Sequence, residues 1–394
     1  MKNRLLFTLV VTVLIALLVA SVVGAAPKDG PIVGLSVTQG KFASSEDVLV
    51  TVTIYNPTKN PVKVLRWFTP EDQTAERLFL VTRNGETVAY TGPVYKRVPA
   101  TGNDYISLRA GASIVRTVNL GASYDLSQDG QYEVAFAVAA FNLFNEKANA
   151  FRAKDVLISQ KISLEVEGRE AKGTPTPPPP GGGGKGTPTP PSPSTPTSLP
   201  PVTPTSTPPS GGGKGTPTPL PPGGGGNSFN ACTTSQQSLL VSARDQSKIY
   251  ASDAENYLLA NILNSRYTTW FGVFSSARYN RVKSNFTAIS NAMDNASVRF
   301  DCTCTQTNVY AYVYPNQPYN IYLCGAFWAA PLTGTDSKAG TLIHEMSHFN
   351  VVAGTGDFAY GQTAARNLAI NNPDNAVQNA DNHEYFAENT PPLP

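Results

Sequence analysis

The sequence predicts a multidomain protein with an N-terminal all-β sandwich, a Pro/Gly-rich linker and a C-terminal α+β domain. Three observations support this fold class. Residues 26–169 contain β-branched and aromatic runs separated by turn signals. Residues 170–226 consist largely of Pro, Gly and Thr, with three copies of Lys-Gly-Thr-Pro-Thr-Pro. Residues 227–394 combine helical spacing of apolar residues with alternating strands.

The composition excludes two classes of partner. Of 394 residues, 41% are hydrophobic, which is enough to bury a core. The formal net charge is only +2, so there is no electrostatic case for a nucleic-acid partner or for an anionic membrane surface.

Residues 1–25 are predicted to be a signal peptide. Lys2 and Arg4 precede an apolar run over 5–23, and the small residues Gly24 and Ala25 follow it. The run is also long enough to span a bilayer, so an uncleaved anchor is the alternative. In both cases the rest of the chain leaves the cytoplasm. We expect a secreted, extracellular protein without membrane contact after signal cleavage.

The N-terminal domain, 26–169, is expected to be a sandwich of about seven or eight short strands. The runs 48–55 and 132–138 are rich in β-branched and aromatic residues, and turn pairs such as Asn84-Gly85 separate such runs. The domain has no histidine and no cysteine, and its sequence indicates no catalytic constellation.

The linker, 170–226, cannot bury a core and is expected to be partly polyproline II. At roughly 3 Å per residue it extends on the order of 100 Å or more, so it need not hold the flanking domains together. Its repeats place Lys172, Lys185 and Lys214 in an open stretch that suits proteolysis. The simpler interpretation is that these lysines keep a repetitive linker soluble.

The C-terminal domain is expected to begin with helix within 235–294 and to continue with strands within 309–324. A further helix is expected to start at Ser337 or Lys338, and more helix is expected within 362–389.

Four cysteines in this domain fit an oxidising compartment. They are Cys232, Cys302, Cys304 and Cys324. Cys302 and Cys304 lie too close along an extended strand to bridge each other readily, so two pairings remain open. These are 232–302 with 304–324, or 232–304 with 302–324. A zinc cluster is disfavoured, because structural zinc sites usually space their cysteines by about two to four residues.

The segment His344-Glu345-Met346-Ser347-His348 contains the pattern His-Glu-x-x-His. Positions i and i+4 of a helix share one face, so both imidazoles can reach one zinc ion. Glu345 then approaches the metal-bound water as a general base. Two ordinary helix histidines beside an exposed glutamate are the alternative. However, the motif holds two of the three histidines in the chain.

A hydrolytic zinc site needs a third protein ligand and one open position. Gly354 and Gly356 let the chain turn back after the helix, and Asp357 follows that turn. Asp357 is therefore the expected oxygen ligand, and His383 and Glu384 are its rivals.

The string HEMSHFNVVAGTGDFAYG, which begins at His344, closely resembles the deuterolysin, or aspzincin, family of zincin-like metallopeptidases. It is nearest to the peptidyl-Lys metalloendopeptidase branch. The resemblance implies one Zn²⁺ per catalytic domain, held by His344, His348 and Asp357. It implies Glu345 as the base and the hydroxyl of Tyr360 as the group that steadies the oxyanion of the tetrahedral intermediate. Simple packing is the alternative for Tyr360.

The resemblance continues over 379–389, which is similar to the segment that forms the S1′ pocket of that branch. There, two carboxylates receive the lysine that follows the cut bond, and Asp381 and Glu384 match them on one helical face. Without the family, a solvated helix face is the simpler interpretation of this pair. His383, between the two acids, has no assigned role.

The same resemblance has two further implications. It selects the disulfide pairing 232–302 with 304–324. It also extends to the N-terminal domain, whose runs 90–97, 108–111 and 120–124 are similar to the pro-region of these peptidases. That likeness suggests a folding aid or an inhibitor that is removed on maturation.

These expectations combine into a secreted zinc endopeptidase that cuts on the amino side of lysine in proteins or peptides, through a zinc-bound water activated by Glu345. Such an enzyme is also expected to cut before its own linker lysines. A broader deuterolysin-like endopeptidase that prefers basic residues is one alternative. A non-catalytic stalked binding protein with a zinc-stabilised head is the other. Glu345, Tyr360 and the acidic pair have no use in such a head, which favours the enzyme.

Overall fold

The computed structural model describes residues 30–43, 45–71, 76–140, 142–144, 155–168 and 226–394. All of them belong to one compact unit that spans 1–171 and 224–394. The predicted signal peptide and most of the predicted linker, with its three lysines, lie outside the described residues. Within the described ranges, every helix is too short or too polar to cross a bilayer.

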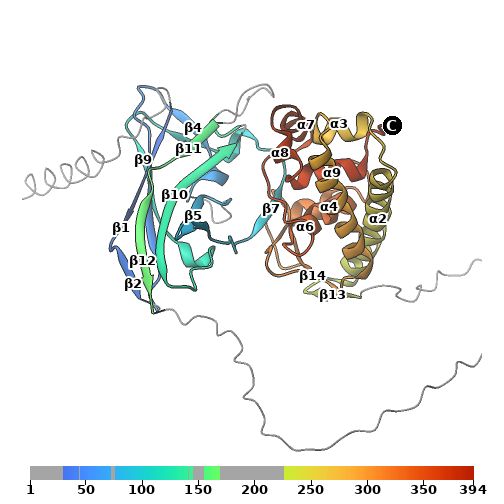
Figure 1. Ribbon diagram of the computed structural model, residues 1–394, viewed down its shortest axis with the longest axis horizontal. Helices are drawn as coiled ribbons and strands as arrows, with labels where there is room; N and C mark the ends of the chain where they lie inside the picture. The colour runs from blue at the N-terminus through green and yellow to red at the C-terminus, as the bar shows by residue number, and fades with distance from the viewer. Residues whose placement is uncertain (1–29, 44, 72–75, 141, 145–154, 169–225) are drawn as a thin grey trace, which may run out of the picture. The chain divides into compact units, whose positions relative to one another are not determined.

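The N-terminal region is rich in β-structure, with twelve strands in its described residues (Figure 1). The expected seven or eight is too low, because several strands have only two to four residues and show no period. The strands are β1 (Ile32–Val37), β2 (Lys41–Ala43), β3 (Leu49–Tyr55), β4 (Val62–Leu65), β5 (Phe79–Arg83), β6 (Glu86–Thr87), β7 (Val94–Arg97), β8 (Tyr105–Leu108), β9 (Ser113–Asn119), β10 (Gly130–Ala140), β11 (Asp155–Ile158) and β12 (Ile162–Glu167).

Two sheets of this region share one hydrophobic core. One has the order β1-β3-β9, and the other has the order β2-β12-β10-β5-β6. Alternate residues of β3, such as Val52, are buried in the same core as Val81 of β5 and Val134 of β10. Val81 and Val134 lie opposite each other in the antiparallel β5–β10 pair. The period-2 pattern of these strands therefore places one face of each sheet in the interior.

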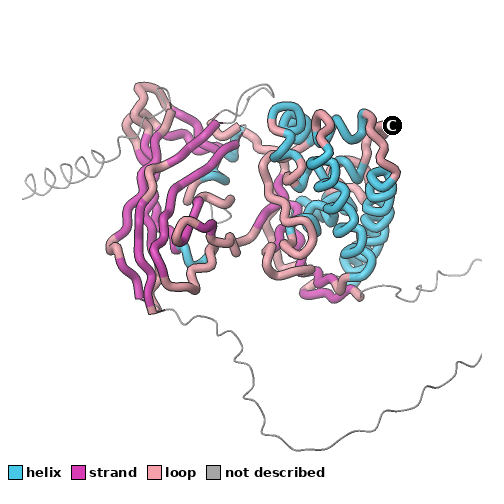
Figure 2. The backbone as a smooth tube through the Cα atoms, in the orientation of Figure 1, coloured by secondary structure: helices cyan, strands magenta, loops and turns pink. Residues whose placement is uncertain are grey.

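The C-terminal region is α+β, as expected, and helices dominate it (Figure 2). The helices are α2 (Thr234–Leu259), α3 (Ser265–Phe271), α4 (Ser276–Asn295), α5 (Gly325–Ala329), α6 (Lys338–His348), α7 (Gln362–Asn371), α8 (Pro373–Ala376) and α9 (Ala380–Glu388). The strands are β13 (Asn227–Asn230), β14 (Val298–Asp301), β15 (Val309–Val313) and β16 (Asn320–Leu323).

The sheet of the C-terminal region has the order β13-β14-β16-β15-β7. The pairs β13–β14 and β14–β16 are parallel, and β15 is antiparallel to β16. Its last strand, β7, comes from the N-terminal region and pairs antiparallel with β15. The two regions thus share one sheet.

The cysteines pair as the family resemblance implied, Cys232 with Cys302 and Cys304 with Cys324. The first bridge ties the start of α2 to the residue after β14. The second joins the segments on either side of the β15–β16 hairpin. Because all four cysteines are bridged, none is available to a metal.

Helix α6, which carries the His-Glu-x-x-His motif, lies in the middle of the C-terminal core. It packs against α2, α4 and α9. Leu342, Ile343 and Met346 are at most 1% exposed and belong to the same core as residues of those helices. A helix buried on all sides gives its histidines fixed positions.

Candidate active site

Hydrogen bonds connect the start of α6 to the end of α9. Ser337 caps the helix, and its Oγ accepts a hydrogen bond from the Gly340 amide at 2.9 Å. The Glu388 carboxylate accepts from both the amide and the hydroxyl of Ser337, each at 2.8 Å. A Cβ at Gly340 would overlap the Glu388 carboxylate and displace it from Ser337. The sequence did not single out Glu388, because its partners lie far away along the chain.

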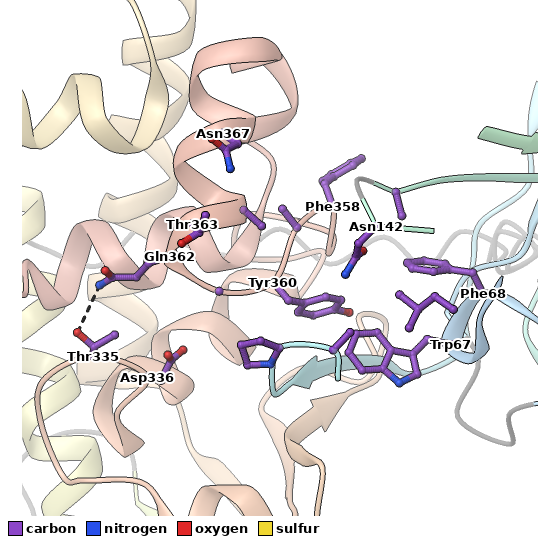
Figure 3. Close-up of a pocket in the computed structure, with 17 residues that line it drawn as sticks. Trp67, Phe68, Asn142, Thr335, Asp336, Phe358, Tyr360, Gln362, Thr363 and Asn367 are labelled. Carbon is purple, nitrogen blue, oxygen red and sulfur yellow. Dashed lines mark hydrogen bonds between the residues drawn. The ribbon is translucent and has the colours of Figure 1, made fainter. Parts of the chain in front are cut away.

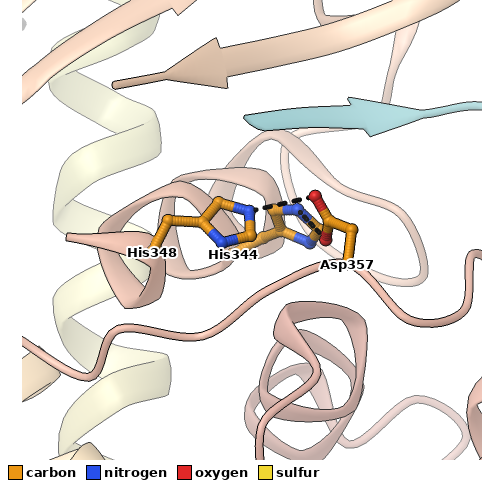
Figure 4. A group of neighbouring side chains, drawn as sticks. All are labelled: His344, His348 and Asp357. Atoms are coloured by element: carbon orange, nitrogen blue, oxygen red, sulfur yellow. Dashed lines mark ion pairs between the residues drawn. The ribbon is translucent and has the colours of Figure 1, made fainter. Parts of the chain in front are cut away.

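Three side chains converge beside α6, as Figure 4 shows. His344 Nε2 lies 3.3 Å from Asp357 Oδ1, and His348 Nε2 lies 3.3 Å from Asp357 Oδ2. All three side chains are at most 1% exposed. One ligand atom from each lies within 4.8 Å of the others.

This cluster fits a zinc ion. Among the described residues, neither Nε2 atom and neither oxygen of Asp357 has a hydrogen-bond partner. Burial alone would raise the pKa of Asp357, but the charges of His348 and His344 hold that pKa below its usual range. Burying polar atoms without a hydrogen bond is costly, and a cation bound among them removes the cost. Two imidazoles and one carboxylate are also a common donor set of catalytic zinc.

The turn after α6 orients His348. Gly354 has φ +60°, which brings the chain back toward the helix. The Thr355 carbonyl then lies 2.9 Å from His348 Nδ1, and the Thr355 amide donates to the Ser347 carbonyl at 3.1 Å. A backbone carbonyl that receives the Nδ1 proton leaves Nε2 free for a metal.

Of the two rivals of Asp357, His383 faces away from the cluster. Its Nδ1 lies 3.0 Å from the Asn379 carbonyl, and its Nε2 lies 3.0 Å from Asn285 Nδ2. The ring packs against Phe271 and Phe286. Burial lowers the pKa of His383 to about 4, so this imidazole is neutral at physiological pH. His383 is thus a packing residue behind the site.

The second rival, Glu384, joins His344 and Asp381 in a separate group whose ligand atoms lie within 4.8 Å of one another. His344 Nδ1 lies 2.9 Å from Asp381 Oδ1 and 3.4 Å from Glu384 Oε2. His344 therefore presents Nε2 to the first cluster and Nδ1 to this pair of carboxylates. The second group already surrounds a cation, the ammonium of Lys96 described below.

Glu345 is fully buried, and neither of its oxygens has a hydrogen-bond partner among the described residues. Burial raises the pKa of Glu345 to about 7. A carboxylate with a pKa near neutrality suits proton transfer at neutral pH.

Tyr360 points its hydroxyl at two acceptors. Tyr360 Oη lies 2.9 Å from the Tyr95 carbonyl oxygen and 2.9 Å from Glu76 Oε1. Its ring packs edge-on against Trp67, with centroids 5.8 Å apart. Both rings line a cavity of about 370 Å³, shown in Figure 3 together with Phe358.

The loop that carries Tyr360 is held by Asn379. Asn379 Oδ1 accepts hydrogen bonds from the amides of Phe358 and Ala359, at 2.7 and 3.2 Å. Asp381 Oδ2 accepts from the Gly361 amide at 2.6 Å. No sequence pattern indicated Asn379, although it stands at the start of the segment that resembles the S1′ pocket.

Asp381 and Glu384 are buried, at 1% and 0% exposed, so the interpretation of a solvated helix face is wrong. Lys96 Nζ lies 2.6 Å from Glu384 Oε2 and 3.6 Å from Asp381 Oδ1. Burial opposes the charge of Lys96, but Asp381 and Glu384 raise its pKa well above the usual value. This pocket therefore holds a charged lysine.

Further groups complete the pocket around the ammonium. Asp336 Oδ1 lies 3.4 Å from Lys96 Nζ. The rings of Tyr310 and Tyr385 face the same nitrogen, with centroids at 4.9 and 5.8 Å. Carboxylates and aromatic faces both favour a cation. The sequence indicated neither tyrosine.

The N-terminal region also supplies residues to the site, which its sequence did not suggest. Besides Lys96, it provides Glu76, whose Oε1 lies 2.6 Å from Arg97 Nε. All three side chains are buried. The one available signal was that Lys96 and Arg97 end the pro-region-like run 90–97.

Comparisons with known proteins agree with this geometry. A family model described as lysine-specific metallo-endopeptidase, the aspzincin family, matches residues 260–388. An extracellular protease from Aeromonas hydrophila is 37% identical, over 88% of this chain and 90% of that protein. A peptidyl-Lys metalloendopeptidase from Grifola frondosa is 36% identical, over 79% of each chain.

A further relative and one solved structure match the C-terminal region. A peptidyl-Lys metalloendopeptidase from Armillaria mellea is 54% identical, over 42% of this chain and 47% of that protein. A solved zinc peptidase from Grifola frondosa is 52% identical, over 41% of this chain and 99% of that chain, with a TM-score of 0.40. The relatives that extend over most of the sequence, taken with the family match, show that this chain belongs to the aspzincin family and is a zinc metalloendopeptidase.

Proposed function

We propose that this protein is a secreted endopeptidase that binds one zinc ion and hydrolyses peptide bonds on the amino side of lysine. Three relatives are named peptidyl-Lys metalloendopeptidase, and a fourth is named extracellular protease. These names support lysine as the P1′ residue and support export.

One observation carries the specificity. The buried acids Asp381 and Glu384 lie beside the metal-ligand cluster and hold a lysine ammonium, that of Lys96, with Glu384 at 2.6 Å. Two carboxylates without other counter-charges would be costly to bury, so the pocket favours a side chain that brings a positive charge. A lysine at P1′ places its ammonium there.

The proposed reaction assigns a task to each residue. His344, His348 and Asp357 hold the zinc ion, which supplies Lewis-acid polarisation of the peptide carbonyl and the attacking water. Glu345 takes a proton from that water and passes it to the leaving amine.

Substrate groups are held by the other site residues. The Tyr360 hydroxyl donates a hydrogen bond to the developing oxyanion. Asp381 and Glu384 hold the P1′ ammonium, and Asp381 also orients His344.

The N-terminal region is proposed to be a pro-region that inhibits the catalytic region or assists its folding. In this interpretation the enzyme cuts before Lys172, Lys185 or Lys214 and releases its own C-terminal region. A mature N-terminus found by mass spectrometry far from all three lysines would argue against self-cutting in the linker.

The test is a digest of a denatured protein of known sequence, with cut sites identified by mass spectrometry. Wild type is compared with Glu345→Gln and with Glu255→Gln, a control at a carboxylate of α2. We expect cuts before lysine in the wild type and the control. Glu345→Gln should retain zinc, measured by metal analysis, and lose activity by about 10²–10⁴-fold.

Other outcomes separate the alternatives. Cuts before several kinds of basic residue would be consistent with a zinc endopeptidase. They would contradict the proposal that Asp381 and Glu384 select lysine. Full activity of Glu345→Gln would overturn the assignment of the base. If the released, zinc-loaded protein cuts nothing, the non-catalytic stalked binding protein becomes the favoured interpretation.

A further inference from the structure

Strand β7 occupies the edge of the catalytic sheet as an added strand. It runs antiparallel to β15, with Tyr95 opposite Tyr312 and Lys96 opposite Ala311. It also contacts α6, the helix of the metal-ligand histidines. An extended peptide that adds to a sheet edge gains main-chain hydrogen bonds, and pockets for its side chains give selectivity.

A bulge in β15 shapes the pocket for Lys96. The register shifts between Val309, which faces Arg97, and Ala311, which faces Lys96. Tyr310 is the extra residue, and its ring lies 4.9 Å from Lys96 Nζ. Bulges are common beside active sites because they redirect a side chain. Here the bulge turns an aromatic face toward the ammonium.

The residue before Lys96 lies where a reacting carbonyl belongs. The Tyr95 carbonyl oxygen is 2.9 Å from Tyr360 Oη, and the next side chain along the chain fills the acidic pocket. The hydroxyl proposed to hold the oxyanion and the pocket proposed to hold P1′ therefore engage consecutive residues of one strand. This is the register of a peptide about to be cut between Tyr95 and Lys96.

We propose that the Tyr95–Lys96 bond is a self-cleavage site, which the chain presents to its own catalytic centre; this rests on the proposed function above. Water adds its oxygen to the Tyr95 carbonyl carbon, and the bond from that carbon to the Lys96 nitrogen breaks. The oxygen stays on Tyr95 as a carboxylate. The protons go to the new α-amine of Lys96. Until the cut, β7 fills the site and excludes other substrates.

Two contacts make this cut slow. Tyr360 has one hydroxyl hydrogen but faces two acceptors, so Glu76 competes with the Tyr95 carbonyl for it. Arg97, the residue after Lys96, is held by Glu76 at 2.6 Å and lies over the Trp67 ring at 5.0 Å. The segment after the bond thus stays anchored in the N-terminal region.

The first experiment follows the cut itself in the full chain. Zinc is added to metal-free wild type, Glu345→Gln, Lys96→Met and Lys161→Met, and fragments are identified by mass spectrometry. Lys161 is an exposed lysine of the same region, 57% exposed, and serves as the control. We expect fragments that end at Tyr95 and begin at Lys96 in the wild type and the control. Their rate should not depend on protein concentration.

The variants should distinguish the role of the catalytic base from that of the lysine in the acidic pocket. Glu345→Gln should leave the bond intact, and Lys96→Met should slow its cleavage by roughly 100-fold, because the acidic pocket then lacks its cation. Lys96→Met should also cut an added lysine peptide sooner than wild type does, because its site is less firmly filled.

The second experiment needs no catalysis. Metal-free full chain is treated with an amine-reactive acylating reagent, and the labelling of each lysine is measured by mass spectrometry. Lys96, buried against Glu384, should react at least about tenfold more slowly than the exposed Lys41 and Lys161. Asp381→Asn with Glu384→Gln should bring Lys96 toward the rate of the exposed lysines.

The outcomes distinguish this proposal from the proposed function. If Lys96→Met cuts external peptides before lysine while wild type keeps Tyr95–Lys96 intact, the function stands and the self-cleavage site is wrong. Rapid labelling of Lys96 in the wild type would likewise overturn the placement of β7. If neither the wild type nor Lys96→Met cuts any peptide before lysine, the proposed function itself is wrong, and the self-cleavage proposal is wrong with it.

Discussion

Asp381 connects three parts of the site. Its Oδ1 lies 2.9 Å from His344 Nδ1 and 3.6 Å from Lys96 Nζ, and its Oδ2 accepts from the Gly361 amide, next to Tyr360. Glu384 is closest to Lys96, at 2.6 Å, and lies 3.4 Å from His344 Nδ1, farther than Asp381 does. The two acids of the pocket are therefore not equivalent.

Single substitutions of the two acids should have different effects. Glu384→Gln should lower kcat/KM for a lysine peptide by roughly 10–100-fold with zinc affinity little changed, because it removes one charge-assisted contact. Asp381→Asn should also weaken zinc binding by roughly 10–100-fold, because it alters the partner of a metal ligand. Peptide kinetics and zinc titration check this, with Asp374→Asn, a 77% exposed side chain, as the control. Equal effects on zinc would contradict the distinction.

His383 should make stability depend on acidity. Burial lowers the pKa of His383 from 6.5 to about 4. Between pH 6.5 and pH 4, His383 is therefore protonated in the unfolded chain and neutral in the folded chain. The wild type therefore loses up to roughly 3 kcal/mol of stability from this residue as pH falls from 6.5 to 4, and none above 6.5.

The variant His383→Gln cannot bind that proton. Its stability deficit relative to wild type, measured by denaturant unfolding in chelator, should shrink as pH falls from 7 to 4. A deficit that stays constant over this range would show that His383 is not the responsible group.

At the residue scale, the sequence predicted those site residues that stand in one local pattern. His344, Glu345 and His348 follow from helical spacing, and Asp357 follows from a glycine turn. Asn379 and Glu388 could not be predicted in the same way. Their functions depend on backbone amides more than twenty residues away along the chain, which no local period encodes.

At the element scale, the end of α3 is fixed against α7. Gly272 terminates α3 with φ +77°, and a Cβ there would overlap the Ala369 carbonyl oxygen of α7. Both the backbone conformation and the close approach require glycine.

Gly272→Ala should therefore destabilise the fold by on the order of 2–4 kcal/mol. Gly334→Ala is the matched control, because Gly334 also has positive φ, +107°, but nothing lies within 4 Å of its Cβ position. The control should cost only about 1 kcal/mol. Melting temperatures measure both variants, and similar losses would mean that the contact with α7 is unimportant.

The sequence predicted long elements better than short ones. Helical spacing indicated the segment that contains α2, α3 and α4, because it persists over many turns. Strand β13, with four residues, shows no period, and the sequence did not predict it. Strand β7 was seen only as part of a run that resembles a pro-region, because its partner is distant in sequence.

At the scale of the whole molecule, β7 links the unfolding of the two regions. Its residues continue directly into the N-terminal core, while its backbone and Lys96 are held by the C-terminal region. Separation therefore requires a buried charge pair to be broken, which is strongly unfavourable when one partner is left behind.

Calorimetry of the full chain should reveal this coupling. Wild type and Lys161→Met should unfold in one cooperative transition, whereas Lys96→Met should show two, one for each region. Two separate transitions in the wild type would mean that the shared sheet does not couple the unfolding of the two regions.

The sequence could not have revealed this arrangement. Lys96 and Glu384 are separated by 288 positions, and the intervening chain includes a linker from which no distance could be inferred. Each region was predicted from its own pattern. The resemblance to a pro-region suggested inhibition, but it did not indicate which residue enters the pocket.

The parallel pairing of β13 sets a limit on how far the N-terminus of a mature enzyme can be trimmed. Asn227 to Asn230 pair with β14, and the Phe229 ring stacks on Phe300 at 6.0 Å. A protease that stopped before Asn227 would remove β7 from the opposite edge of this sheet and leave β13 in place beside β14. Digestion a few residues further would leave β14 as an unprotected edge, which favours association with other chains. The resistance of the mature enzyme to aggregation would then depend on the residue at which trimming ends.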